Sequence, residues 1–250
     1  MSIFPSQEVV IGNTADVVGR VADEIEAGIR ERAQNREGYV LGLATGSTPI
    51  PLYAELVRRY REEDLSFQNV ITFNLDEYEG LKPNHPESYH AFMEKHLIGR
   101  IDIRSELSFL PPGIYEDAAG EAAEAYEEKI REFGGIDLQI LGIGRDGHIG
   151  FNEPGSARES RTRRVSLAAE TREDAAPAFG GLENVPTHAM TMGVATILDA
   201  RRIVLMARGE GKREIVARAM NETVSSDLPA TFLQDHSNAA WYLDGAAAGK

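Results

Sequence analysis

The stretch LGIGRDGHIGFNEP, from Leu141 to Pro154, decides the predicted fold and points to a site. The segment before it, IDLQIL at residues 136–141, is a mostly apolar run typical of a strand buried on both faces. The stretch itself contains too much glycine for a helix, which predicts a loop at a strand end. Asp146, His148 and Glu153 fall on this loop. Carboxylates beside a histidine form a group that can move protons near neutral pH.

The residues of this loop are also compatible with a dinucleotide site, a metal site or a structural role. GIGRDG matches the dinucleotide-binding pattern GxGxxG, which requires a helix directly after its last glycine. Gly150, Asn152 and Pro154 follow instead, so we expect no nicotinamide site. Aspartate, histidine and glutamate also bind metals, but no HxxxH or HExxH spacing and no cysteine accompany them. We therefore expect no metal and no cofactor, and a structural histidine on an ordinary turn stays the alternative.

Strand-like and helix-like segments alternate along the chain. Patterns typical of buried strands occur at residues 39–44, 69–75, 136–141, 200–209 and 239–243. Helical patterns occur at residues 13–29, 49–60, 88–98, 118–133 and 209–222. This alternation predicts an α/β fold with a mostly parallel sheet and helices on both faces, in a single domain of residues 1–250.

The segment at about residues 156–184 has the weakest pattern. It is polar, and it contains five arginines between Arg158 and Arg172 as well as Gly180 and Gly181. Because it directly follows the loop with His148, we interpret it as a lid. A long surface connection is the alternative.

Polar groups also follow the other predicted strands. Thr45, Gly46, Ser47 and Thr48 lie between the first strand and a helix, where backbone N–H groups and the helix dipole suit a phosphate. Asp76 follows the second strand, and Lys212 follows a glycine turn after a later strand. Each group alone is explained equally well as a cap or a surface charge. Since ligands bind outside the carboxyl ends of parallel strands, together they predict an acid–base enzyme for a small phosphorylated molecule.

Composition limits the classes of partner. The formal net charge is −14 and the pI is near 4.9, whereas nucleic-acid-binding proteins are usually basic, so we expect no nucleic-acid partner. The absence of cysteine excludes disulfides and thiol catalysis. The N-terminal sequence has no signal-peptide pattern, and no apolar run approaches the about 20 residues of a membrane span. We therefore expect a cytoplasmic location without membrane association.

The motifs of the chain resemble those of the glucosamine-6-phosphate deaminase family over about residues 11–243. These motifs are LGLATGSTP, TFNLDEYEGL, HPESYHAFM, LGIGRDGHIGFNEPGS, TMGVATILDA and GEGKREIV. The resemblance implies the deaminase/isomerase fold, a modified Rossmann-like sheet. It also implies amino-sugar catabolism, in which glucosamine 6-phosphate and water become fructose 6-phosphate and ammonia without a cofactor. The partner is then a small phosphorylated amino sugar, and the oligomeric state stays open.

The resemblance also implies a role for each matched residue. Asp76 matches the carboxylate that moves a proton between C2 and C1. His148 matches the acid–base that opens the sugar ring, and Asp146 and Glu153 match the carboxylates that orient it and relay protons to it. The matched phosphate contacts are Thr45, Gly46, Ser47, Thr48 and Lys212.

One departure from the family concerns the phosphate clamp. Many members have an arginine in a TRxxNSRFF-like lid segment, whereas this chain has TREDAAPAF at residues 171–179, with Pro177 at the arginine position. Arg172 is the expected substitute. Galactosamine-6-phosphate deaminases vary in this region, so the choice between the two amino sugars stays open.

A second departure concerns regulation. Val165 stands where activated members have a basic residue, and the chain ends at Lys250 without their longer tail. We therefore expect no activation by N-acetylglucosamine 6-phosphate. Two other functions are kept as alternatives: a 6-phosphogluconolactonase-like hydrolase and a non-enzymatic sugar-phosphate sensor.

Overall fold

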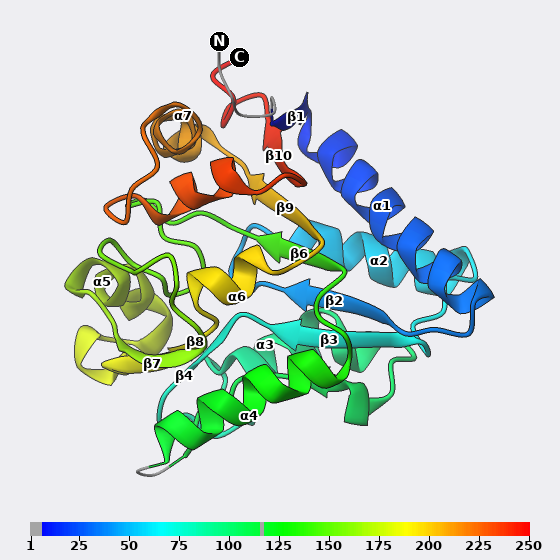
Figure 1. Cartoon of the computed structure of the whole chain (residues 1–250), viewed down its shortest axis with the longest axis horizontal. Helices are drawn as coiled ribbons and strands as arrows, with labels where there is room; N and C mark the ends of the chain where they lie inside the picture. Colours follow the sequence, from blue (N-terminus) through cyan, green and yellow to red (C-terminus); the bar gives the residue numbers. More distant parts are fainter. Residues whose placement is uncertain (1–6, 116–117) are drawn as a thin grey trace.

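A seven-stranded parallel sheet forms the centre of the molecule (Figure 1). The computed structural model describes residues 7–115 and 118–250, so residues 1–6, which belong to the segment without a signal-peptide pattern, lie outside it. The strand order is β1-β10-β9-β6-β2-β3-β5, and all neighbouring pairs are parallel. The strands are β1 (Glu8–Gly12), β2 (Tyr39–Leu43), β3 (Val70–Asn74), β5 (Ser108–Phe109), β6 (Leu138–Leu141), β9 (Arg202–Ala207) and β10 (Ala239–Asp244).

Helices cover both faces of this sheet, which confirms the predicted fold class (Figure 1). One face packs against α1 (Thr14–Gln34), α2 (Ile50–Glu62) and α3 (Tyr89–His96). The other packs against α4 (Ala119–Glu132), α6 (Val194–Leu198) and α7 (Arg213–Asn221). Short 3₁₀ helices are η1 (Ile98–Arg100), η2 (Ser105–Leu107), η3 (Leu182–Asn184), η4 (Glu210–Lys212) and η5 (Pro229–Asp235). In the described part of the chain, no helix is both long and apolar enough to cross a membrane.

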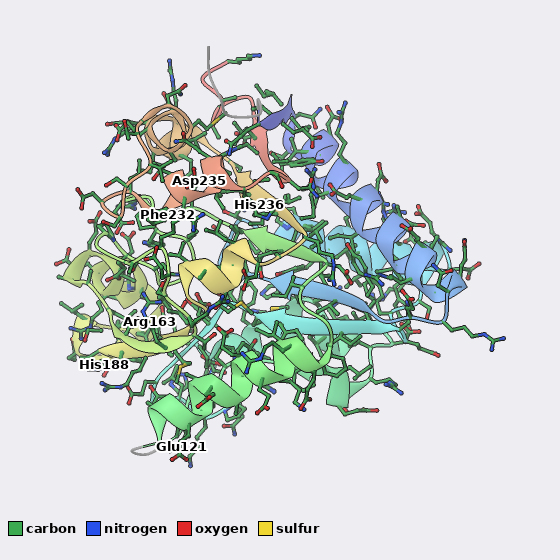
Figure 2. The ribbon with its side chains drawn as sticks, viewed as in Figure 1. Glu121, Arg163, His188, Phe232, Asp235 and His236 are labelled. Carbon is green, nitrogen blue, oxygen red and sulfur yellow. The ribbon has the colours of Figure 1, made fainter. Side chains whose placement is uncertain are left out.

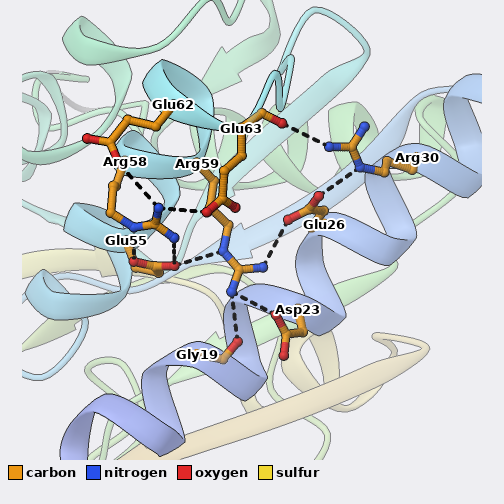
Figure 3. Close-up of polar contacts among 9 residues, drawn as sticks. All are labelled: Gly19, Asp23, Glu26, Arg30, Glu55, Arg58, Arg59, Glu62 and Glu63. Carbon is orange, nitrogen blue, oxygen red and sulfur yellow. Dashed lines mark hydrogen bonds and ion pairs between the residues drawn. The ribbon is translucent and has the colours of Figure 1, made fainter.

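An ion-pair network holds α1 against α2 (Figure 3). The guanidinium of Arg59, with a side chain only 10% exposed, lies 2.7 Å from Asp23, 2.9 Å from Glu26 and 2.9 Å from Glu55. Because Arg59 is shielded from water and meets partners from both helices, it fixes their relative position better than an exposed pair would.

A second sheet was not predicted from the sequence. It is antiparallel and contains three strands in the order β4-β8-β7: β4 (Asp76–Tyr78), β8 (His188–Thr191) and β7 (Arg163–Ser166). The segment at residues 156–184, which had no clear pattern, contributes β7, α5 (Ala169–Phe179) and η3 to this region. The strands of this sheet and η3 are short, and α5 has no buried residue. None of them therefore shows the apolar periodicity that identifies larger elements.

The order of the strands brings two loops together at one edge of the main sheet. β3 pairs with one side of β2, and β6 pairs with the other side. Such a point, where connections leave in opposite directions, opens a crevice at the carboxyl ends of the strands. In Figure 1 these ends of β2, β3 and β6 face the small sheet and α5, on the left of the view.

Candidate active site

A cavity of about 420 Å³ lies at the carboxyl ends of β2, β3 and β6. Its lining includes four of the predicted segments, namely the Thr45–Thr48 turn, Asp76, His148 and Lys212. The structure thus brings together side chains that are far apart in the sequence. Within residues 7–115 and 118–250, no group of three or more His, Cys, Asp or Glu side chains could hold a metal ion.

Close backbone packing holds the loop that carries His148. Gly144 N–H donates to the His148 carbonyl at 2.9 Å, and Gly147 N–H donates to the Gly144 carbonyl at 3.2 Å. A Cβ atom on Gly144 would lie only 2.3 Å from the His148 ring, and Gly147 has a φ of +84°, which favours glycine. These glycines therefore serve to seat the imidazole. No helix follows them directly, in contrast to a dinucleotide-binding loop.

Asp146 contacts His148 at two points. Its Oδ1 lies 2.7 Å from the ring Nδ1 and accepts the His148 backbone N–H at 3.1 Å. The contact between Oδ1 and Nδ1 is close but departs from ideal hydrogen-bond geometry. Burial raises the pKa of Asp146, but the hydrogen bond and charge of His148 outweigh this and lower it. An ionised Asp146 favours the tautomer with a proton on Nδ1, which leaves Nε2 as the acceptor.

Asp76 begins β4 immediately beyond the end of β3. Its side chain is buried, and a Cβ atom on Gly150 would lie 3.4 Å from Asp76 Oδ2, so the His148 loop packs against this carboxyl group. Burial and the neighbouring Glu77 carboxylate raise the pKa of Asp76 to about 8. A carboxyl group with a pKa near the working pH can take up and release a proton in turn.

Glu77 joins β4 to the start of α3. Its buried carboxylate accepts backbone N–H groups from Tyr78 at 2.8 Å, Tyr89 at 2.9 Å and His90 at 3.0 Å. Tyr89 and His90 lie in the first turn of α3, where N–H groups have no partner within the helix. Burial raises the pKa of Glu77, although these N–H groups oppose the shift. Glu77 thus fixes α3, and with it the Tyr89 side chain, against the cavity.

An aromatic wall of the cavity was missed in the sequence analysis. It consists of Tyr78, Tyr89 and Phe151, which all line the cavity. The ring of Tyr89 stacks on Phe151 with centroids 5.9 Å apart and lies 4.9 Å from that of Tyr78. Each residue stands inside a motif quoted above, but the spacing in the sequence does not indicate that the rings meet.

The Thr45–Thr48 turn and Lys212 both line the cavity. The turn passes through Gly46, which has a φ of +92°, and leads into α2 at Ile50. Lys212 closes η4, and its Nζ donates to the Ile143 carbonyl at 2.7 Å. Burial lowers the pKa of Lys212, and the charge of Arg145 lowers it further. An anion bound beside Lys212 would stabilise the charged form of its side chain, which makes this part of the lining suitable for a phosphate.

Two charged residues of the cavity were also missed. Arg145, on the His148 loop, and Asp174, in α5, both line it, and Arg145 Nη1 lies 3.2 Å from Asp174 Oδ1. Arg145 could have been noticed as a cation inside the glycine-rich motif. Asp174 had no such signal, because α5 itself was not predicted.

Neither Glu153 nor Arg172 lines the cavity. Their side chains instead bind groups in or beside α5. The Glu153 carboxylate accepts the Ala168 N–H at 2.9 Å and the Thr171 hydroxyl at 2.6 Å, both near the start of α5. Arg172 donates to the carbonyls of Leu182 at 3.0 Å and Val185 at 3.1 Å. In this conformation both side chains hold the segment in place. A proton relay by Glu153 and a phosphate contact by Arg172 stay predictions.

A larger cavity, of about 880 Å³, lies between α4 and β7 and contains none of the predicted site residues. Its buried carboxylate, Glu127, accepts the N–H of Thr162 at 2.8 Å and its hydroxyl at 2.6 Å. Arg163, labelled in Figure 2 on β7, donates to Asn152 Oδ1 at 2.8 Å and Ser156 Oγ at 3.2 Å. These polar groups already have protein partners, so we assign the chemistry to the smaller cavity.

The chain is similar to known proteins over nearly its whole length. A family model described as glucosamine-6-phosphate isomerases/6-phosphogluconolactonase matches residues 12–241. Glucosamine-6-phosphate deaminase of Rhodopirellula baltica is 50% identical over 220 residues, which cover 88% of this chain and 87% of that protein. The enzyme of the same name from Hahella chejuensis is 47% identical over 242 residues, which cover 97% of this chain and 91% of that protein.

Solved structures show the same likeness. A monomeric glucosamine-6-phosphate deaminase matches with a TM-score of 0.92 and 39% identity, over 97% of this chain and 99% of that one. A 6-phosphogluconolactonase from Thermotoga maritima matches with a TM-score of 0.73 and 20% identity, over 95% of this chain and 99% of that one. The second similarity extends to the fold alone.

Proposed function

The chain belongs to the family of glucosamine-6-phosphate isomerases and 6-phosphogluconolactonases, and from this premise we propose that it converts glucosamine 6-phosphate and water into fructose 6-phosphate and ammonia. Relatives at 50% and 47% identity carry the name of this activity. The observation at the site that carries the proposal is Asp76, a buried carboxyl group whose pKa is raised to about 8 in the cavity that also holds His148.

The first step is the opening of the sugar ring, which we assign to His148. A group must deprotonate the anomeric hydroxyl and protonate the ring oxygen. An imidazole can do both near neutral pH, and its contact with Asp146 supports this assignment, since the carboxylate favours one tautomer and stabilises the cation.

The second step moves a proton from C2 to C1, and we assign it to Asp76. The open-chain aldehyde acidifies the C2 proton, a carboxylate takes it, and the resulting enol receives it at C1. A base with a raised pKa holds the proton between the two transfers better than an ordinary carboxylate does. The imine formed at C2 in this way then adds water, and the resulting carbinolamine expels ammonia to leave the ketone of fructose 6-phosphate. These steps together consume one water and release one ammonia.

Binding of the phosphate is assigned to the Thr45–Thr48 turn and Lys212, supported by their place in the lining of the same cavity. We further propose that the lid at about residues 156–184 covers the substrate through α5. Two features support this: Thr171 and Asp174 line the cavity, and α5 has no buried residue. A cytoplasmic location also stays a prediction, which localisation of the tagged chain would test.

The proposal is tested by measuring ammonia and fructose 6-phosphate with purified enzyme. Glucosamine 6-phosphate and galactosamine 6-phosphate are supplied side by side. We expect equal amounts of ammonia and fructose 6-phosphate from the glucosamine substrate, and little product from the galactosamine one. Ammonia from galactosamine 6-phosphate alone would move the assignment to that sugar, and no ammonia from either would contradict it. 6-Phosphogluconolactone serves as a control substrate for the hydrolase alternative.

A further inference from the structure

Arg145 and Asp174 form an ion pair across the mouth of the active-site cavity, and nothing in the proposed chemistry accounts for it. Arg145 comes from the loop after β6, and Asp174 comes from α5 on the opposite side. Both side chains line the cavity, and both are about half or more exposed, at 67% and 47%. An exposed pair of this kind stabilises a fold by only about 0.2–1 kcal/mol, so stability alone explains little of it.

The cavity also holds a second cation close to the first. Within the described residues, Arg145 and Lys212 are the arginine and lysine side chains of the lining. Arg145 is near enough to lower the pKa of Lys212 by charge repulsion. Two cations that face one cavity repel each other unless an anion lies between them. The chain has a net charge of −14, so an anionic ligand depends on local cations such as these two.

Other arginines in the region are held away from the cavity by their own hydrogen bonds. Arg172 binds the carbonyls of Leu182 and Val185. Arg163 binds Asn152 and Ser156, and Arg208 binds the Ser47 carbonyl at 2.7 Å. Pro177 occupies a position in α5 that offers no charge. Arg145 is thus the guanidinium that can meet a substrate anion without breaking a backbone or buried contact.

We propose that Arg145 and Lys212 together bind the phosphate of the substrate. In the absence of substrate Asp174 pairs with Arg145, and the phosphate then displaces Asp174 from this pair. This inference rests on the proposed function, because it assumes a phosphorylated ligand. A phosphate offers oxygens to the planar fork of a guanidinium, which binds them in pairs. It also carries more negative charge than the Asp174 carboxylate, so exchange of partners is favoured when the ligand arrives.

The exchange would couple phosphate binding to the position of α5. Asp174 stands on a helix with no buried residue, which is anchored at its start by Glu153 through Ala168 and Thr171. Once Arg145 turns to the phosphate, α5 loses this ion pair with the His148 loop. Asp174 therefore acts as a specificity-determining group: ligands without a phosphate cannot compete with it for Arg145.

The experiment compares Arg145→Gln, Asp174→Asn and the wild type, with Arg104→Gln as a matched control. Arg104 is an exposed arginine paired with Glu106 at 3.7 Å, remote from the lining of the cavity. Lys212→Ala serves as the positive control. The readouts are KM and kcat for the phosphorylated amino sugar, and binding of inorganic phosphate by calorimetry. Thermal unfolding checks that each variant is folded.

For Arg145→Gln we expect KM to rise about tenfold or more with kcat changed far less, and phosphate binding to weaken by a similar factor. For Asp174→Asn we expect KM to fall about two- to fivefold, because a competing anion is removed. Arg104→Gln should match the wild type. The proposal is overturned if Arg145→Gln matches Arg104→Gln in both KM and phosphate binding, or if Asp174→Asn raises KM as Arg145→Gln does. Failure of the wild type to release ammonia would instead contradict the proposed function, and phosphate binding would still test the clamp.

Discussion

The Nδ1 atom of His148 lies 2.7 Å from Oδ1 of Asp146, two positions earlier on the same loop. The ring also rests on Gly144, where a side chain would collide with it. These contacts orient the imidazole from one edge and one face. Nε2 is then the nitrogen that remains for chemistry in the cavity.

Removal of the imidazole should slow the cyclic substrate more than an open-chain one. His148→Gln keeps a side chain of similar length but cannot exchange protons near neutral pH. We expect ammonia release from the cyclic sugar to fall about 10²–10⁴-fold. The reverse reaction of fructose 6-phosphate with ammonia, followed by its initial rate, should fall less. An equal loss in both directions at the chemical step would argue against a dedicated role in ring opening.

Asp76 should reduce the stability of the fold at high pH. Its ordinary pKa is 3.8 and its pKa in the fold is about 8, so between these values the folded chain binds a proton more readily than the unfolded chain. The free energy of unfolding should therefore decrease as pH rises from about 4 to about 8 through this group. Asp76→Asn removes the buried charge and should be more stable than the wild type above pH 8, by on the order of a few kcal/mol. Urea unfolding at pH 9 and at pH 4 measures the difference, which should disappear at the lower pH. If the variant is no more stable than the wild type at pH 9, ionisation of Asp76 does not destabilise the fold.

Glu77 should set the pH range of activity through its charge on Asp76. Glu77→Gln keeps one amide oxygen that can accept an N–H group at the start of α3, but it removes the adjacent negative charge. The acidic limb of the pH profile of kcat/KM should therefore move to lower pH. Burial raises the pKa of Tyr78 to about 12 and the pKa values of Tyr89 and Tyr126 well above their ordinary value, so all three stay neutral in this range.

Glu79→Gln is the matched control for this profile, because Glu79 follows on the same segment and pairs with Arg164 outside the cavity. If the acidic limb does not move in Glu77→Gln, the role of Glu77 is to hold α3 in place and not to set the pKa of Asp76.

The enzyme should not respond to N-acetylglucosamine 6-phosphate as an activator. Arg163 already donates to Asn152 and Ser156, and burial lowers its pKa. Val165, two positions along the same strand, packs with an apolar cluster and offers no charge to a phosphate. We expect hyperbolic rate curves that this compound leaves unchanged below the concentrations at which it competes for the active site. A sigmoidal curve that becomes hyperbolic on its addition would contradict this expectation.

The predictable part of the molecule is the part whose burial follows a period. Strands such as β2 and β3 are mostly apolar and buried throughout, and α1 shows a continuous buried face, so the parallel sheet and its helices could be predicted. β4, β7 and β8 are three or four residues long and depend on each other for pairing. β4 and its partner β8 lie more than 100 residues apart along the chain, as Asp76 and Thr191 show, and no local pattern reveals such a pairing.

The site divides in the same way. Asp76, His148 and Lys212 follow strands of the main sheet, so the rule for parallel sheets was sufficient to bring them together. Arg145, Asp174 and Tyr89 reach the cavity through side-chain direction and through the unpredicted α5. Glu153 shows the opposite case: it lies on the predicted loop, yet its carboxylate turns to Ala168 and Thr171.

The rate of ammonia release by Asp76→Asn tests directly whether Asp76 carries the proton between C2 and C1 of the open-chain sugar. The variant keeps the size of the side chain, so the chain should fold and bind inorganic phosphate as the wild type does. We predict that ammonia release from glucosamine 6-phosphate falls at least about 10²–10⁴-fold at every pH from 6 to 9. Turnover within a few-fold of the wild type, in a variant shown to be folded, would contradict the account.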